Sequence, residues 1–271
     1  MTIFIIKQIS QKNRIFYKVM LLVIVIIILK LFIHYFDLEK INMNALFSGL
    51  IGANVFLMGF LLNGVLADYK ESEKLPGELA ASLATIADEI EILCKGSNSP
   101  VPAEAYCYFI ALSDKIKRWL YKDEKTYTVA KSITGLNDFF IKFEGLTQAN
   151  FITRLKQEQN NLRKLMIRIH TIRETDFISS GYFIAKTTTI LLLAGLVFTK
   201  IEPFYDSLFF VGLVSYLLIF LIYLIKDLDN PFGYYDDSSS EDVSLKPLLD
   251  VIDDINIRER AVRENFLKVT S

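Results

Sequence analysis

The stretch that decides the fold is NALFSGLIGANVFLMGFLLNGVLADY, from Asn44 to Tyr69. It contains no charged side chain before Asp68, and about 20 apolar residues are enough to carry a helix across a bilayer. We therefore expect a transmembrane helix over roughly residues 44–67, continued beyond the membrane by a charged amphipathic segment.

One face of this predicted helix has an unusual composition. At about 100° per residue, five side chains fall in a single stripe. They are Gly52, Phe56, Phe60, Asn63 and Ala67. Two large rings, a glycine and an amide on one side of a helix can line a pore, but ordinary helix packing produces the same pattern. Gly49 and Ala53 also form a small-xxx-small pair, which lets another backbone approach closely.

The composition of the whole chain is that of a membrane protein. Of its 271 residues 52% are hydrophobic, and the mean hydropathy of +0.34 is too high for a soluble enzyme of this size. The 30 Lys and Arg residues nearly balance the 31 Asp and Glu residues, so net charge gives no sign of a nucleic-acid partner. The sequence has no His/Cys metal spacing, glycine-rich phosphate loop or nucleophile elbow. We expect neither an enzyme nor a bound cofactor.

Three further apolar runs complete a set of four predicted spans, at residues 19–36, 182–199 and 207–225. The basic and apolar segment 1–18 is predicted to lie at the membrane surface as an amphipathic helix, with a signal peptide as the alternative. Lys30, inside the first run, is close enough to its end to snorkel to the interface; the alternative is that it faces the protein interior.

Residues 68–181 are polar but patterned, and their apolar spacing predicts a helical region. Pro76 is expected to break the first helix, and Gly96 to Pro102 form a loop. The predicted helices are 71–95, 103–121, 129–143 and 150–178. One face of the last helix is basic, which either a solvated surface or a docking site for anions explains. Its cationic residues are Arg154, Lys156, Arg163, Lys164, Arg168 and Arg173.

Loop charge predicts the orientation. Lys and Arg are concentrated in the N-terminal segment, at the edges of residues 68–181 and in the tail, 226–271. The only basic residues in the two short turns between spans are Lys40 and Lys200. The positive-inside rule therefore places both termini and residues 68–181 in the cytosol. The predicted fold is an all-α membrane protein in which residues 19–67 and 182–225 each supply two transmembrane helices, with a cytosolic helical body between them.

Two motifs resemble the bestrophin family of ion channels. In FLMGF, the residues Phe56, Gly59 and Phe60 match the F-x-x-G-F element of the family's second span, and an acidic and aromatic stretch follows in both. The tail has NPFG before an acidic loop, and a final amphipathic helix is predicted over about 245–268. Two departures stand out: Gly52 replaces a bulky neck residue, and Asp68-Tyr69 replaces an Arg/Trp pair.

The resemblance implies a homopentamer in a bacterial inner membrane, with the second span of each copy around a pore. Such a pore passes small monovalent ions, chloride by analogy with the family. The implied neck residues are Gly52, Phe56, Phe60 and Asn63, where apolar rings gate by excluding water. The implied vestibule residues are Asp68, Glu71, Glu73 and Glu78, although rings of carboxylates favour cations. Interhelical packing is the alternative role of the two phenylalanine rings.

The tail has two expected elements. A tight turn is expected at Asn230, Pro231, Phe232 and Gly233. In eukaryotic bestrophins, carboxylates after this motif bind calcium, which takes six to eight oxygen ligands. The corresponding candidates here are Asp236, Asp237, Glu241 and Asp242, which three serines divide. A solvated acidic loop is the alternative to a calcium site.

The expected function is thus a bestrophin-like ion channel whose partners are the lipid bilayer, copies of itself and small inorganic ions. The alternative is a non-conducting membrane scaffold or sensor whose cytosolic helices bind a partner.

Overall fold

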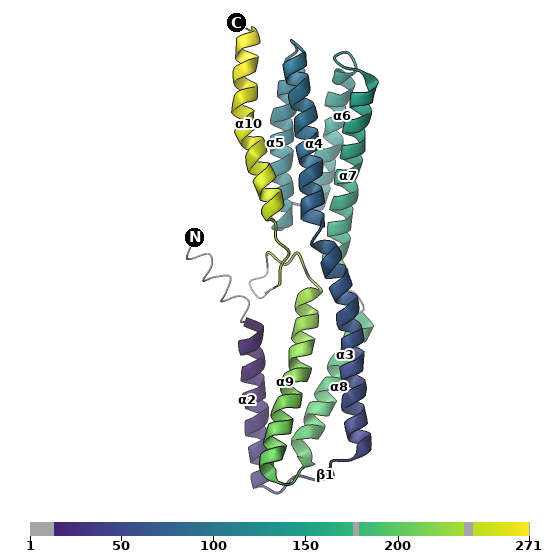
Figure 1. Cartoon of the computed structure of the whole chain (residues 1–271), viewed down its shortest axis with the longest axis vertical. Helices are drawn as coiled ribbons and strands as arrows, with labels where there is room; N and C mark the ends of the chain where they lie inside the picture. The colour runs from purple at the N-terminus through teal and green to yellow at the C-terminus, as the bar shows by residue number, and fades with distance from the viewer. Residues whose placement is uncertain (1–13, 176–178, 236–240, 271) are drawn as a thin grey trace. The chain divides into compact units, whose positions relative to one another are not determined.

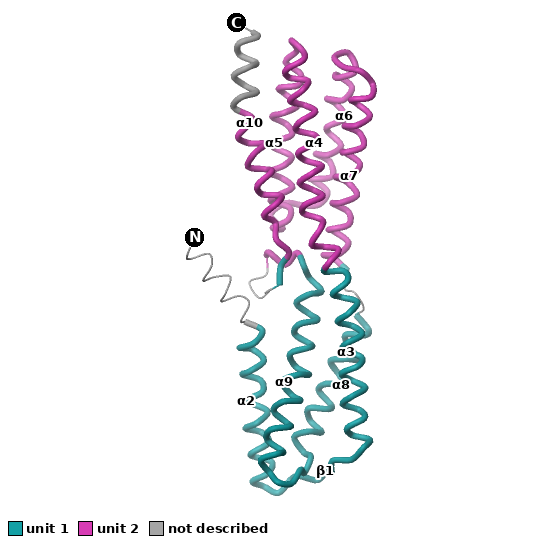
Figure 2. The backbone as a smooth tube through the Cα atoms, in the orientation of Figure 1, with its two compact units in different colours: residues 1–69, 175–231, 236–242 teal, residues 70–174, 232–235, 243–271 magenta. Residues whose placement is uncertain are grey.

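The computed structural model describes residues 14–175, 179–235 and 241–270. The chain divides into two compact units, which Figure 2 distinguishes by colour. The first unit is built from the described parts of residues 1–69, 175–231 and 236–242. The second is built from those of residues 70–174, 232–235 and 243–271.

The helices of the first unit confirm the predicted all-α membrane fold. They are α2 (Arg14–Tyr35), α3 (Ala45–Ser72), α8 (Ser179–Phe198) and α9 (Phe204–Leu228), drawn in Figure 1. Among the described residues, four helical stretches are long and apolar enough to cross a membrane, and each covers one of the predicted spans to within one residue. The predicted surface helix at 1–18 falls mostly outside the described residues, and α2 is already helical at Arg14. The last residues of α3, from Lys70, belong to the second unit.

The core of the first unit combines two clusters. In one, Met58 and Leu61 of α3 pack with Leu192 of α8 and Leu218 of α9. In the other, the side chain of Val19 on α2 packs with residues of α9. The helices approach closely where a glycine permits it: a Cβ on Gly195 would lie 2.8 Å from the Phe47 ring.

A short strand pair joins the two links between spans. β1 (Ile41–Asn42) and β2 (Thr199–Lys200) run parallel, with Ile41 opposite Thr199 and Asn42 opposite Lys200. Two residues are too few to show the alternation by which a strand is recognised in a sequence, so this pair was not predicted.

Lys30 does not snorkel, and that prediction is wrong. Its side chain is fully buried, and its ammonium lies 2.5 Å from Glu39 Oε1. It also donates to the carbonyl oxygens of Val197, at 3.3 Å, and of Thr199. An ammonium has three donors, and each has an acceptor here. The Val197 carbonyl lies in the last turn of α8, where helix carbonyls lack intrahelical partners and the helix dipole favours a cation, and the Thr199 carbonyl follows in β2.

Glu39 completes this arrangement from the link after α2. Its side chain is 5% exposed, and its second oxygen lies 3.1 Å from His34 Nδ1. The His34 ring stacks on Phe204 at 3.7 Å between centroids. Burial raises the pKa of Glu39. The hydrogen bonds and charges of Lys30 and His34 together lower it by more than burial raises it, so the pKa lies below its ordinary value. The carboxyl group is therefore ionised at neutral pH and pairs with Lys30.

The second unit is a helix bundle and agrees with the predicted helices. It contains α4 (Leu75–Gly96), α5 (Val101–Leu120), α6 (Thr126–Phe143), α7 (Ala149–Glu174) and α10 (Lys246–Thr270). The predicted break is present, because α3 ends at Ser72 and α4 starts at Leu75 with Pro76 in its first turn. Buried residues from the five helices form the core, among them Leu83, Phe109, Trp119, Ile133, Leu162 and Ile252.

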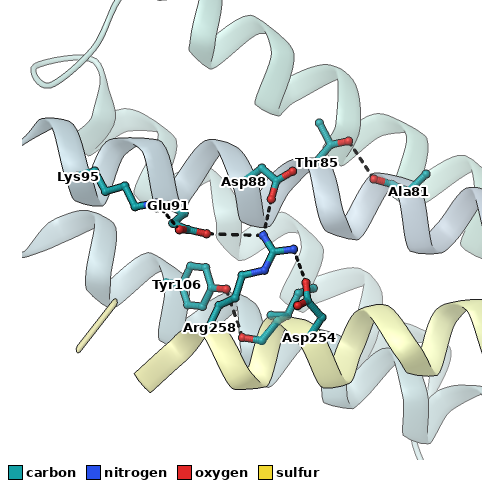
Figure 3. A network of polar contacts seen from close by, with 9 residues as sticks. Ala81, Thr85, Asp88, Glu91, Lys95, Tyr106, Asp254 and Arg258 are labelled. Atoms are coloured by element: carbon teal, nitrogen blue, oxygen red, sulfur yellow. Dashed lines mark hydrogen bonds and ion pairs between the residues drawn. The ribbon is translucent and has the colours of Figure 1, made fainter. Parts of the chain in front are cut away.

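A polar network fixes α10 to the bundle, as Figure 3 shows. Arg258 of α10 pairs with Asp88 of α4 at 2.5 Å, with Glu91 at 3.6 Å and with Asp254 on its own helix. The Tyr106 hydroxyl of α5 donates to the Ile255 carbonyl at 3.2 Å. Both cysteines are free thiols, and burial raises the pKa of Cys94 to about 11, so this thiol is protonated at neutral pH.

The buried pair of Lys30 and Glu39 is expected to affect the stability of the first unit. Lys30→Met leaves the Glu39 carboxylate buried without its ammonium partner, and breaking such a pair costs about 3–5 kcal/mol. We expect chemical denaturation in detergent to show a loss of this size in the free energy of unfolding.

Lys30→Met combined with Glu39→Met tests the cause of that loss. Replacing both members of a buried pair with apolar side chains is often neutral, so the double variant should regain most of the stability. A double variant as unstable as Lys30→Met contradicts the interpretation. Lys18→Met, at an exposed position of the same helix, is the control.

Candidate functional site

The stripe on α3 lies on the face that the other described residues leave exposed. Phe56 is 78% exposed and Phe60 is 64% exposed. Gly52 and Asn63 on the same stripe are exposed too, whereas Met58 and Val65, on the opposite face, are buried. Packing within a single chain therefore does not account for the two phenylalanine rings.

Three glycines on or near the stripe face open space as well. A Cβ added to Gly49, Gly52 or Gly59 would meet no atom within 4 Å. No described residue uses the close approach that Gly49 permits. The exposed face of α3 is thus smooth around the two rings, and its small residues remain available to a second protein surface.

A buried amide fixes the opposite face of α3. Asn54 is 4% exposed, and its Nδ2 donates to Thr189 Oγ1 of α8 at 2.9 Å. Its Oδ1 lies 2.6 Å from the hydroxyl of Thr188, which donates to it. Polar groups inside an apolar bundle need partners, so these bonds set the rotation of α3 about its axis. The sequence shows an amide in one span and adjacent threonines in another, but nothing local in the sequence indicates that these side chains meet.

The four predicted vestibule residues lie in different surroundings. Asp68 is half-buried in the first unit, and Glu73 and Glu78 are exposed in the second. Glu71 forms a bidentate pair with Arg168 of α7, at 2.8 Å and 2.6 Å. The hydrogen bonds from Arg168 lower the pKa of Glu71. The Arg168 charge offsets that of Glu71, a pairing that the sequence analysis missed.

Comparison with known proteins identifies the fold through structure alone. No protein-family model matches the chain, and no curated protein matches its sequence. Three structures of a bacterial bestrophin homologue from Klebsiella pneumoniae match it with TM-scores of 0.67, 0.70 and 0.69. The sequence identities are 17%, 17% and 18%, over 94%, 94% and 96% of this chain and 98%, 98% and 99% of theirs.

The chain has the bestrophin fold. The resemblance carried by FLMGF and NPFG is therefore confirmed at the level of fold, over nearly the whole chain. A further structure of similar fold, titled only as a membrane protein, has a TM-score of 0.71 at 17% identity and covers 92% of this chain and 98% of its own.

The NPFG segment follows the last spanning helix of the bestrophin fold. Two of its residues, Pro231 and Phe232, lie in a turn, and Phe232 is fully buried. Phe232 to Tyr235 belong to the second unit, where the Tyr234 hydroxyl donates to the Val243 carbonyl at 2.5 Å. The segment thus anchors the start of the tail in the helical body by a buried ring and a hydrogen bond.

The predicted calcium ligands are only partly visible. Asp236 and Asp237 lie outside the described residues, while Glu241 and Asp242 are half-buried. Where the structure describes the chain, no three His, Cys, Asp or Glu side chains gather closely enough to hold a metal ion. The calcium site in the acidic loop stays a prediction.

Two asparagines on α3 provide a matched test of the orientation of this helix. Asn54→Leu removes both hydrogen bonds to α8, and we expect the free energy of unfolding to fall by about 1–2 kcal/mol, as for interhelical hydrogen bonds in membranes. Asn63→Leu, on the exposed stripe, should leave it within about 0.5 kcal/mol of the wild type. Equal losses in chemical denaturation would contradict the assigned orientation.

Proposed function

We propose that the protein is a bestrophin-like ion channel in which small monovalent ions pass along the exposed face of α3. The observation that carries the proposal is the exposure of Phe56 and Phe60 on a spanning helix of this fold. Lipid contact alone would suit the two rings. It does not suit Asn63 on the same stripe, because an amide facing hydrocarbon lacks hydrogen-bond partners. Water in a pore supplies those partners.

The proposed assembly is a homopentamer that places the stripe of each copy around one axis. Rings of Phe56 and Phe60 then form an apolar constriction, which gates by excluding water. Gly52 has no side chain, and a Cβ at this position would meet no atom within 4 Å. The constriction is therefore shorter than a neck with a third bulky residue. Asn63 offers amide donors to an anion that has lost part of its hydration shell.

Chloride is the ion we propose. Carboxylates along the path favour cations, but Arg168 offsets the charge of Glu71. Glu73 and Glu78 remain as exposed acids and set how strongly anions are preferred. The proposed location is a bacterial inner membrane with both termini in the cytosol, in agreement with the distribution of Lys and Arg.

The gate is tested by removing its rings. Phe56→Ala and Phe60→Ala widen an apolar constriction, so chloride flux from reconstituted liposomes should rise severalfold in each variant. Phe209→Ala is the matched control, because Phe209 is also an exposed phenylalanine of a spanning helix, at 63%. Flux that is absent from the wild type and from both α3 variants would instead support the scaffold or sensor hypothesis.

Assembly and selectivity are tested on the same preparation. The mass of the detergent-solubilised protein should correspond to five chains of 31.1 kDa. Replacing chloride with gluconate should abolish the current, and replacing potassium with N-methyl-D-glucamine should leave it. A monomer or dimer would overturn the channel proposal, and loss of current on cation replacement would overturn the choice of chloride.

A further inference from the structure

A cleft lies between α4 and α7 within the second unit. Its volume is about 530 Å³, inside the range of small-molecule sites, about 300–1,000 Å³. Both helices contribute hydrogen-bonding side chains to its lining. They include Glu78, Ser82 and Thr85 of α4 and Glu158, Asn161 and Lys164 of α7.

Apart from Lys164, the cations on the basic face of α7 form hydrogen bonds or ion pairs with other residues of the chain. Arg154 pairs with Glu89 at 3.2 Å, and Arg168 pairs with Glu71. Arg163 donates to the Thr134 hydroxyl at 3.1 Å, and Arg173 donates to the Trp119 carbonyl at 3.0 Å. Lys156 bonds Asn137 and Gln159. Neither a purely solvated surface nor an anion-docking surface therefore describes this face; it mainly binds α7 to its neighbours.

The charged side chains that line the cleft, unlike these paired cations, have no charged partners where the structure describes the chain. Lys164 and Glu78 are exposed, and in the described part of the chain neither has an ion pair within 4.0 Å. Among the described residues, the Glu158 carboxylate accepts hydrogen bonds only from a neutral amide, that of Asn161 on its own helix, at 3.3 Å and 3.4 Å. The cleft thus presents two carboxylates and one ammonium without charged partners.

Helix geometry gives the order of these groups along the cleft. The pairs Glu71–Arg168 and Glu89–Arg154 show that α7 runs antiparallel to the chain from Glu71 to Glu89. Glu78 therefore lies at the Lys164 end of the cleft. Glu158 precedes Lys164 by six residues, which is about 9 Å along a helix. One carboxylate is thus near the ammonium, and the other is set apart from it.

We propose that this cleft binds a free basic amino acid of the lysine type. Such a molecule carries two ammonium groups and one carboxylate, which complements the two carboxylates and one ammonium of the cleft. Its α-carboxylate pairs with Lys164, its α-ammonium with Glu78 and its side-chain ammonium with Glu158. Thr85, whose hydroxyl donates to the Ala81 carbonyl at 2.9 Å, and the buried Ser82 add neutral oxygens that can accept hydrogen bonds from the ligand. This proposal does not depend on ion conduction.

Calorimetry on the full-length protein in detergent tests the site with three probes. L-Lysine carries all three charges, L-norleucine lacks the side-chain ammonium and cadaverine lacks the carboxylate. We expect L-lysine to bind about tenfold or more tightly than either comparator, since a lost charge-assisted hydrogen bond weakens binding by that order. Absence of L-lysine binding, or equal binding of all three probes, would overturn the proposal.

Variants assign each end of the ligand. Lys164→Met should weaken L-lysine about tenfold and leave cadaverine unchanged, whereas Glu158→Gln should weaken L-lysine about tenfold and leave norleucine unchanged. Lys131→Met, at an exposed position of α6 outside the cleft, is the matched control. Circular dichroism and the melting temperature confirm that each variant is folded. Equal effects of Lys164→Met and Lys131→Met would refute the assignment of Lys164.

Discussion

The first unit depends on how the buried ammonium of Lys30 is satisfied. An unpaired cation inside an apolar bundle is too costly to persist, so its three acceptors must stay in place. Those acceptors come from the link after α2, from the last turn of α8 and from β2, which follows it. The interaction is therefore a geometric constraint more than a source of stability, because desolvation offsets much of the attraction in a buried ion pair. It fixes the ends of two spans against each other.

The same interaction also limits where α3 can begin. Glu39 is held by Lys30, and Ile41 and Asn42 pair with β2 only three residues before α3 begins at Ala45. Further along, the bonds from Asn54 to Thr188 and Thr189 fix the rotation of the helix. With the start and the rotation both set by polar contacts on one side, the opposite stripe is left facing outward. The exposure of Phe56 and Phe60 is thus a consequence of where the polar partners lie.

The sequence predicts the elements of this fold better than their contacts. Apolar runs and helical spacing locate the spans and the helices of the body, and Pro76 marks the break before α4, because these signals are local in the chain. The partners of Lys30, Asn54 and Glu71 lie up to 169, 135 and 97 residues away. No periodicity encodes such pairs. Snorkelling of Lys30 was wrong for this reason: distance from the end of a run takes no account of carbonyls supplied by another helix.

The same distinction separates polar groups that the fold explains from those on which the two proposals rest. Lys30 and Asn54 are buried polar residues of spanning helices, and each is satisfied by the chain itself, so the fold explains them. Asn63 on a spanning helix and Lys164 at the cleft are different, because the described chain provides no partner for either side chain. Selection for stability alone favours an apolar residue at the first position. We propose that water and ions complete the surroundings of the first group and that a small molecule completes those of the second.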